Sequence, residues 1–175
     1  MQRTTHSPQH PQAQYTVRWV FGQLSAARRQ AIVAFWVRED AIQCAEEAWR
    51  RAWEVACVLE EAGTGAIAGV CTVAIGFDET QRSFGFARIF IGKRHRHAGL
   101  GVRMGQRMIE GFEVLAYEPG APYRLLAGIE NPKLEARGGQ RLLASLGFTV
   151  IGKTAEGGML VERLLASHPD RIEVA

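Results

Sequence analysis

The chain has 175 residues, of which 47% are hydrophobic and 22% charged, a balance typical of one globular domain large enough to bury a core. The net charge of +3 is too small to indicate nucleic-acid binding, because one local site accounts for such an excess. No apolar run reaches the length of a membrane span. We therefore expect a cytoplasmic location and no membrane partner.

Three cysteines, Cys44, Cys57 and Cys71, lie in apolar or helical patterns, and no Cys or His pair has the spacing of a metal site. They are predicted to be buried free thiols in a reducing compartment, and no metal is expected. The polar residues 1–14 are predicted to form a disordered segment and residues 166–175 a flexible tail. Residues 15–165 are then a single domain.

The domain is predicted to begin with a strand and two helices. Residues 15–21 are rich in β-branched and aromatic side chains, which favour a strand. Ser25 is the predicted N-cap of the first helix, and Asp40 that of a second helix through residues 41–55. The apolar residues that recur every four positions in the second helix are predicted to pack inward: Ala45, Trp49 and Trp53.

Strands and amphipathic helices alternate through the rest of the domain. The predicted strands are residues 56–63, 66–76, 84–91, 123–130, 148–153 and 158–165; the predicted helices are residues 100–117 and 134–146, the latter capped by Gly147. The whole order is β-α-α-β-β-β-α-β-α-β-β. It predicts an α/β (α+β) fold with a mixed, mostly antiparallel central sheet of about seven strands and flanking helices.

One stretch, IFIGKRHRHAGLGVRMGQRM at residues 89–108, passes from an apolar strand through a basic run and two glycines into a helix. Gly99 and Gly101 carry no Cβ, so their backbone can approach an anion at the positive end of the helix dipole. Arg96 adds positive charge, with Lys93 and Arg94 nearby. The spacing of a Rossmann fingerprint or of a P-loop is absent. A phosphate-binding loop is therefore predicted here.

The spacing R-x-x-G-x-G from Arg96 to Gly101 resembles the pyrophosphate-binding signature of the GNAT superfamily, the N-acyltransferases that use acetyl-CoA. The resemblance continues into LLAGIEN at residues 125–131 and LASLGF at residues 143–148, and it covers roughly residues 56–165. It implies a GNAT-like fold, acetyl-CoA as co-substrate and a small-molecule or peptide amine as acceptor.

The resemblance also implies roles for particular residues. Main-chain groups of residues 89–91 would run alongside the pantetheine arm, and the N–H of Ile89 would polarise the acetyl carbonyl. Asn131 matches an asparagine that often contacts the coenzyme, although a turn residue before Pro132 explains it equally well. The implied coenzyme-binding residues are Ile89, Phe90, Ile91, Arg96, His97, Ala98, Gly99, Leu100, Gly101, Val102 and Asn131.

The catalytic side chains are less plainly marked. Glu130 ends a predicted strand where the acetyl group should lie, so it is the first choice of general base, with a surface carboxylate as the equal alternative. Arg88 stands near positions where relatives often carry a carboxylate. Leu143 stands where the family often has a tyrosine that protonates the leaving thiolate. That acid is then unidentified, replaced by water, or unnecessary for the acceptor.

The predicted function is an N-acetyltransferase that transfers an acetyl group to a primary amine by direct attack. The acceptor site would lie between the first two helices and the last hairpin, and solvated helix faces explain its acidic candidates as well: Glu39, Asp40, Glu46 and Glu47. Two alternatives stay open, a catalytically silent acyl-CoA-binding protein of the same fold and a basic protein associated with nucleic acid. No nucleic-acid partner is expected, and a homodimer remains an option.

Overall fold

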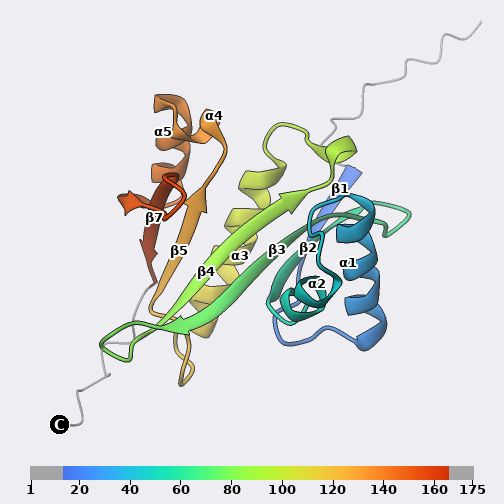
Figure 1. Cartoon of the computed structure of the whole chain (residues 1–175), viewed down its shortest axis with the longest axis horizontal. Coiled ribbons are helices and arrows are strands. Elements are labelled where there is room, and N and C mark those ends of the chain that lie inside the picture. Colours follow the sequence, from blue (N-terminus) through green and yellow to red (C-terminus); the bar gives the residue numbers. More distant parts are fainter. Residues whose placement is uncertain (1–13, 166–175) are drawn as a thin grey trace, which may run out of the picture.

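A seven-stranded open sheet organises the chain in the computed structural model, which describes residues 14–165 (Figure 1). The strands are β1 (Tyr15–Trp19), β2 (Val55–Glu61), β3 (Ile67–Phe77), β4 (Ser83–Ile91), β5 (Arg124–Ile129), β6 (Thr149–Lys153) and β7 (Met159–Leu164). The helices are α1 (Ala26–Arg38), α2 (Ala45–Arg51), the 3-10 turn η2 (Lys93–His95), α3 (Leu100–Leu115), α4 (Pro132–Glu135) and α5 (Arg137–Ser145).

The strands lie in the order β1-β2-β3-β4-β5-β7-β6. Only β4 and β5 run parallel, and all other neighbours are antiparallel. A parallel pair needs a crossover, which α3 supplies between β4 and β5. The predicted mixed, mostly antiparallel α/β sheet is confirmed. The expected disordered segment and flexible tail lie outside the described residues, apart from Gln14.

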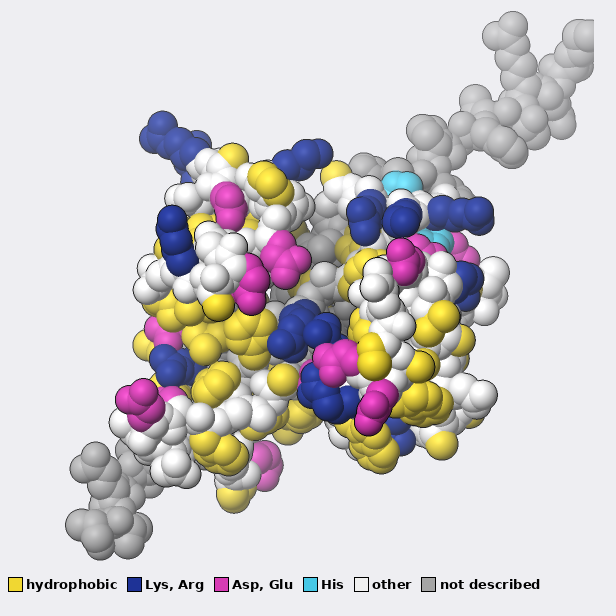
Figure 2. Space-filling view, viewed as in Figure 1, with side chains coloured by type: hydrophobic (Ala, Val, Ile, Leu, Met, Phe, Trp, Pro, Cys, Tyr) yellow, Lys and Arg dark blue, Asp and Glu magenta, His cyan; other side chains and the backbone are white. Residues whose placement is uncertain are grey.

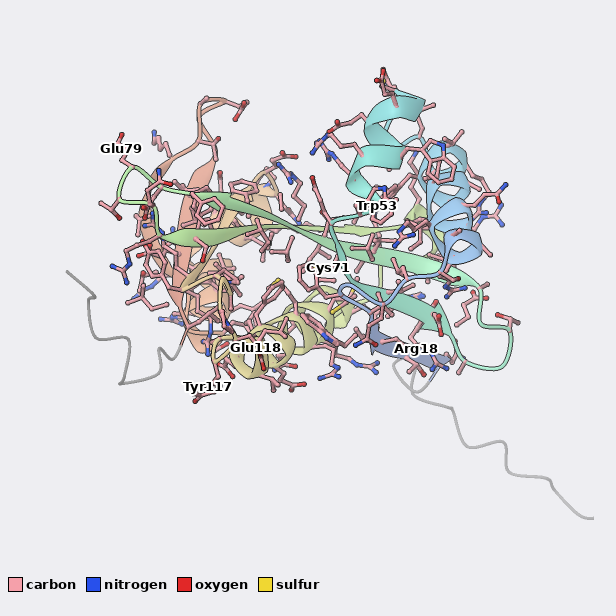
Figure 3. The ribbon with its side chains drawn as sticks, turned by 90° about the horizontal axis from the view of Figure 1, so that it is seen from below. Arg18, Trp53, Cys71, Glu79, Tyr117 and Glu118 are labelled. Carbon is pink, nitrogen blue, oxygen red and sulfur yellow. The ribbon has the colours of Figure 1, made fainter. Side chains whose placement is uncertain are left out.

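Helices cover both faces of the sheet, with α1 and α2 on one face and α3 on the other (Figure 3). Met104, Met108 and Phe112 of α3 are buried against the sheet, as their helical spacing predicts. On the opposite face, α1 buries Ile32 and Phe35 against the strands. Throughout residues 14–165, every helix is too short or too polar to span a bilayer.

The second helix begins later than predicted. Asp40 does not cap it, because its own φ of 54° places it in a left-handed turn directly after α1. The helix α2 begins at Ala45 and has Cys44 as its N-cap, without a side-chain capping hydrogen bond. Cys44 is consequently exposed, contrary to the prediction of a buried thiol. Cys57 and Cys71 are buried opposite each other in the core, where burial raises the pKa of Cys57 to about 12.

The prediction that the tryptophans of the predicted second helix, residues 41–55, pack inward is wrong; α2 itself ends at Arg51, before Trp53. Trp49 is 45% exposed and Trp53 68% exposed, whereas Ala48 and Ala52 are buried against α1 and the sheet. Small side chains let α2 approach its neighbours closely, and the larger face is left outside. The ring of Trp53 is covered by the Arg29 guanidinium, whose central carbon lies 3.7 Å from the ring centroid.

The last predicted helix is divided into two pieces. The backbone of Ala136, between α4 and α5, is extended, so one helix does not continue through residues 134–146. A Cβ at Gly139 would lie 2.2 Å from the Cα of Leu134, so glycine allows the two pieces to cross in close contact. Gly147, with φ of 77°, ends α5 as predicted.

Candidate active site

The parallel strands β4 and β5 separate part-way along their length. Their last paired residues are Ala87 and Ala127, but β4 continues to Ile91. The N–H of Gly92 donates to Ala68 on β3, so by alternation the peptide groups of Ile89 and Ile91 point the other way, toward β5. Among residues 14–165, no strand pairs with β4 on that side beyond Ala87. The backbone of Ile89 therefore faces an open gap.

The loop next to this gap leads into helix α3, and a glycine stands at the N-cap of that helix. Gly99 is the N-cap of α3 and has a φ of 86°, a left-handed conformation that favours glycine. Gly101 has open space where a Cβ would stand. The first N–H groups of any helix lack intrahelical partners, and at α3 these belong to Leu100, Gly101 and Val102, of which Leu100 makes a long hydrogen bond to the His97 carbonyl oxygen at 3.4 Å. An anion placed there would meet backbone donors and the positive end of the helix.

Basic side chains surround the loop. Figure 2 shows dark-blue and cyan side chains gathered on the part of the molecule where β4 leads into α3, beside a hollow that separates it from α4 and α5. Lys93, Arg94, Arg96 and His97 are exposed there. Arg96 also donates from Nε to the Ile91 carbonyl oxygen at 3.1 Å, which places its guanidinium at the end of β4.

The two histidines of the loop lie against β1. The Tyr15 hydroxyl and His95 Nδ1 are 3.1 Å apart, and His95 Nδ1 lies 3.5 Å from a carboxylate oxygen of Glu61. The His97 ring centroid is 5.9 Å from that of Tyr15. Both imidazoles therefore stand on the loop side of the gap, away from the end of β5.

The candidate base and its neighbour follow β5. Glu130 is exposed, and within residues 14–165 its carboxylate has no hydrogen bond or ion pair. Asn131 caps α4, because its Oδ1 accepts a hydrogen bond from the Lys133 N–H at 3.0 Å. Leu143 is half-buried against the core under the sheet. The capping role accounts for Asn131 structurally, and a contact between its amide nitrogen and the coenzyme stays a prediction.

Comparison with known proteins bears on the fold. No family model and no curated protein matches the sequence. A GNAT-family acetyltransferase from Streptococcus pneumoniae is similar over 87% of this chain and 99% of its own, with 20% identity and a TM-score of 0.59. A putative acetyltransferase from Salmonella typhimurium, solved with its cofactor acetyl-CoA, covers 91% of this chain and 98% of its own, with 19% identity and a TM-score of 0.61. The chain has the GNAT fold.

A third solved structure agrees. A ribosomal-protein-S5-alanine acetyltransferase from Vibrio fischeri covers 86% of this chain and 93% of its own, with 14% identity and a TM-score of 0.61. The short motif from Arg96 to Gly101 and the fold of the whole chain thus resemble the same family. Identities this low show the fold and leave the reaction to be argued from the residues.

Glu39 has a different place in this GNAT fold from the one expected. It was a candidate for holding a cationic acceptor, but its Oε2 accepts a hydrogen bond from the Lys93 N–H at 3.0 Å. Its side chain is only 14% exposed. A Cβ on Gly92 would stand 3.1 Å from the same carboxyl group. Glu39, at the end of α1, therefore anchors the start of the loop between β4 and α3.

Two substitutions of Glu39 should distinguish its role as a hydrogen-bond acceptor from the effect of its negative charge. Glu39→Ala removes the acceptor of the Lys93 N–H, and we expect acetyl-CoA affinity to fall about 5-fold, since hydrogen bonds to charged groups contribute about 1.5–3 kcal/mol before screening at the surface. Glu39→Gln keeps an acceptor oxygen and removes negative charge near the predicted phosphate site, so it should bind at least as tightly as the wild type. Calorimetry checks both, and equal affinities for the two variants would contradict the anchoring role.

Sequence reasoning missed one pair of groups. Arg88 of β4 faces Glu54, which lies between α2 and β2, with 3.8 Å between Arg88 Nη1 and Glu54 Oε2. Glu47, another expected acceptor acid, is occupied by Arg50 and Arg51, whose hydrogen bonds lower its pKa to about 2. The only sequence signal was that Arg88 stands where relatives often carry a carboxylate. Nothing local in the sequence indicates which residue faces it.

Proposed function

We propose that the chain is an acetyl-CoA-dependent N-acetyltransferase that acts on a primary amine. The observation that carries the proposal is the separation of β4 from β5 beside a glycine-led helix start. The gap offers unpaired backbone donors for an extended coenzyme arm, and the helix start offers donors for its phosphates. The GNAT fold of the chain supports the same assignment.

The coenzyme is proposed to lie across both features. Its pyrophosphate would contact the loop and the first turn of α3, and its pantetheine arm would follow the end of β4. The N–H of Ile89 would donate to the thioester carbonyl oxygen, where negative charge develops during the reaction. The proposed coenzyme contacts are Ile89, Phe90, Ile91, Arg96, His97, Ala98, Gly99, Leu100, Gly101, Val102 and Asn131.

In the proposed reaction the neutral amine nitrogen attacks the thioester carbonyl carbon. A C–N bond forms, the C–S bond breaks, and coenzyme A leaves as a thiolate. The amine proton passes to Glu130, directly or through water. Leu143 has no proton to give, so the thiolate leaves unaided or is protonated by water. A thiol is acidic enough for this, because the pKa of a free cysteine is only about 8.5.

A silent acyl-CoA-binding protein is the second candidate, favoured by the aliphatic Leu143 and by the exposure of Glu130. The two candidates differ in turnover alone. Thiol release from acetyl-CoA, measured with a panel of primary amines, supports the enzyme if any amine accelerates it. Coenzyme binding without acceleration by any amine supports the silent protein.

Acetyl-CoA should stabilise the chain in either case. A ligand that binds only the native state adds about 2.7 kcal/mol at a concentration of 100 times Kd, which corresponds to a Tm increase of about 5–10 °C for a chain of this size. Thermal unfolding with and without the coenzyme measures the shift. Acetylated pantetheine, which lacks the pyrophosphate, is the control and should shift Tm much less. An unchanged Tm with acetyl-CoA would contradict the proposed function.

A further inference from the structure

Arg88 lies at the point where the proposed reaction takes place. It is the first residue of β4 beyond the last pair with β5, and it precedes Ile89. Val55, Thr72 and Arg88 stand opposite one another across β2, β3 and β4, so they share one face of the sheet. Val55 packs in the core beneath α1 and α2. Arg88 is therefore on the α1 and α2 face, beside the backbone gap at Ile89.

The guanidinium of Arg88 has donors to spare. Its side chain is 40% exposed, and within the described part of the chain it donates no hydrogen bond. Its distance of 3.8 Å to Glu54 Oε2 exceeds that of a hydrogen bond. Glu54 forms only a long ion pair with Arg88: its Oε1 accepts from Arg50 Nη1 at 2.6 Å, and its buried Oε2, the oxygen that faces Arg88, has no hydrogen-bond partner among residues 14–165. The Phe86 ring supports the guanidinium from beneath, with its centroid 4.7 Å from the central carbon.

Positive charge is in excess around Arg88. Three guanidinium groups, those of Arg50, Arg51 and Arg88, are paired with two carboxylates, those of Glu47 and Glu54. Burial, and then the charge of Arg51, lower the pKa of Arg88, as expected for a cation that its surroundings compensate incompletely. Figure 2 shows dark-blue and magenta side chains together at the foot of the hollow. An anion bound here would balance the excess positive charge, whereas a further cation would add to it.

We infer that Arg88 binds a carboxylate of the acceptor, so that the acceptor is a free amino acid rather than a polyamine. The inference rests on the proposed function and concerns the same site. A guanidinium binds a carboxylate through two parallel hydrogen bonds, which fixes the orientation of the bound molecule. Glu130 follows β5 across the gap from Arg88. The carboxylate of an amino acid then meets β4, while its amine points to the thioester and to the base proposed on β5.

The experiment compares amino acids with their carboxamides as acceptors in the thiol-release assay. The carboxamide keeps the amine and loses the negative charge. We expect the wild type to favour the acid by about 10-fold or more in kcat/KM, as for the loss of a charge-assisted hydrogen bond. Arg88→Gln should remove that preference by raising KM for the acid, with little change for the carboxamide. Arg82→Gln is the matched control, because Arg82 lies before the other end of β4 and stacks on Tyr123; it should change neither acceptor.

Product binding gives a readout that needs no turnover. N-acetyl amino acids should bind the complex with coenzyme A more tightly than N-acetyl carboxamides, and Arg88→Gln should abolish the difference. If the wild type showed equal kcat/KM for acid and amide and equal affinity for the two products, or if it preferred aliphatic diamines, the assignment of Arg88 would be overturned. Failure of the wild type to bind the coenzyme would instead overturn the proposed function, so the two failures are distinguishable.

Discussion

Gly99→Val is expected to lower acetyl-CoA affinity by about 100-fold or more in a chain that remains folded. At a φ of 86° the isopropyl group is sterically strained, and it would stand where we propose that the loop approaches phosphate oxygens. Loss of two backbone hydrogen bonds to a charged group, each contributing about 1.5–3 kcal/mol, corresponds to a loss of this size. Calorimetric titration measures it, and Gly99→Ala should give an intermediate affinity.

Gly120→Val is the matched control for this substitution. Gly120 also has a positive φ, 79°, and open space around its Cβ position, but it lies in the turn that follows α3 at the end remote from the loop. It should carry a similar conformational cost, which lowers Tm in both variants, and leave coenzyme affinity unchanged. If Gly99→Val bound acetyl-CoA as Gly120→Val does, the loop would not be the phosphate site.

The conformation of the loop between β4 and α3 is the part of the candidate site that the sequence could predict. Its features depend on residue types that are close together in the chain: Gly99 in a left-handed N-cap, Gly101 facing open space, and a helix whose buried face Met104 and Met108 mark by their spacing. Local conformation and helical period are properties of short segments. They hold without knowledge of the rest of the fold.

The misplaced residues depended on tertiary packing. The stripe of Trp49 and Trp53 predicted an inward face, but periodicity alone cannot say that α1 approaches the smaller Ala48 and Ala52 instead. The Arg29 guanidinium then gives Trp53 a partner at the surface. A stripe of large side chains indicates that a helix has two faces; the neighbouring element decides which one is buried.

The sequence could not predict that Arg88 and Glu54 lie next to each other, because this contact depends on strand register. Three strands must align so that Val55, Thr72 and Arg88 fall in one row, and a shift of one residue would turn Arg88 toward α3. Register across several strands is set by the whole sheet. The same limit applied to Glu39, which sequence reasoning placed among the acceptor acids and which instead binds the Lys93 N–H from the end of α1.

Glu130→Gln is expected to lower kcat/KM for the acceptor by about 100-fold or more and to leave acetyl-CoA affinity unchanged. General base catalysis typically contributes 10²–10⁴-fold, and a carboxamide cannot take a proton. A carboxylate base works only when deprotonated, so wild-type activity should fall as pH decreases, and the part of that fall due to Glu130 should be absent in the variant. The measurements are kcat/KM against pH with one amine acceptor, and coenzyme titration at a single pH.

Glu79→Gln is the control that isolates the position of the charge. Glu79 is an exposed carboxylate in the turn between β3 and β4, at the opposite end of β4 from the gap (Figure 3). It carries the same change in net charge and should leave both kcat/KM and its pH profile as in the wild type. Full activity of Glu130→Gln would show that Glu130 is not the base. Proton removal would then fall to water, and catalysis in this chain would depend on how the gap positions the amine against the thioester beside Ile89.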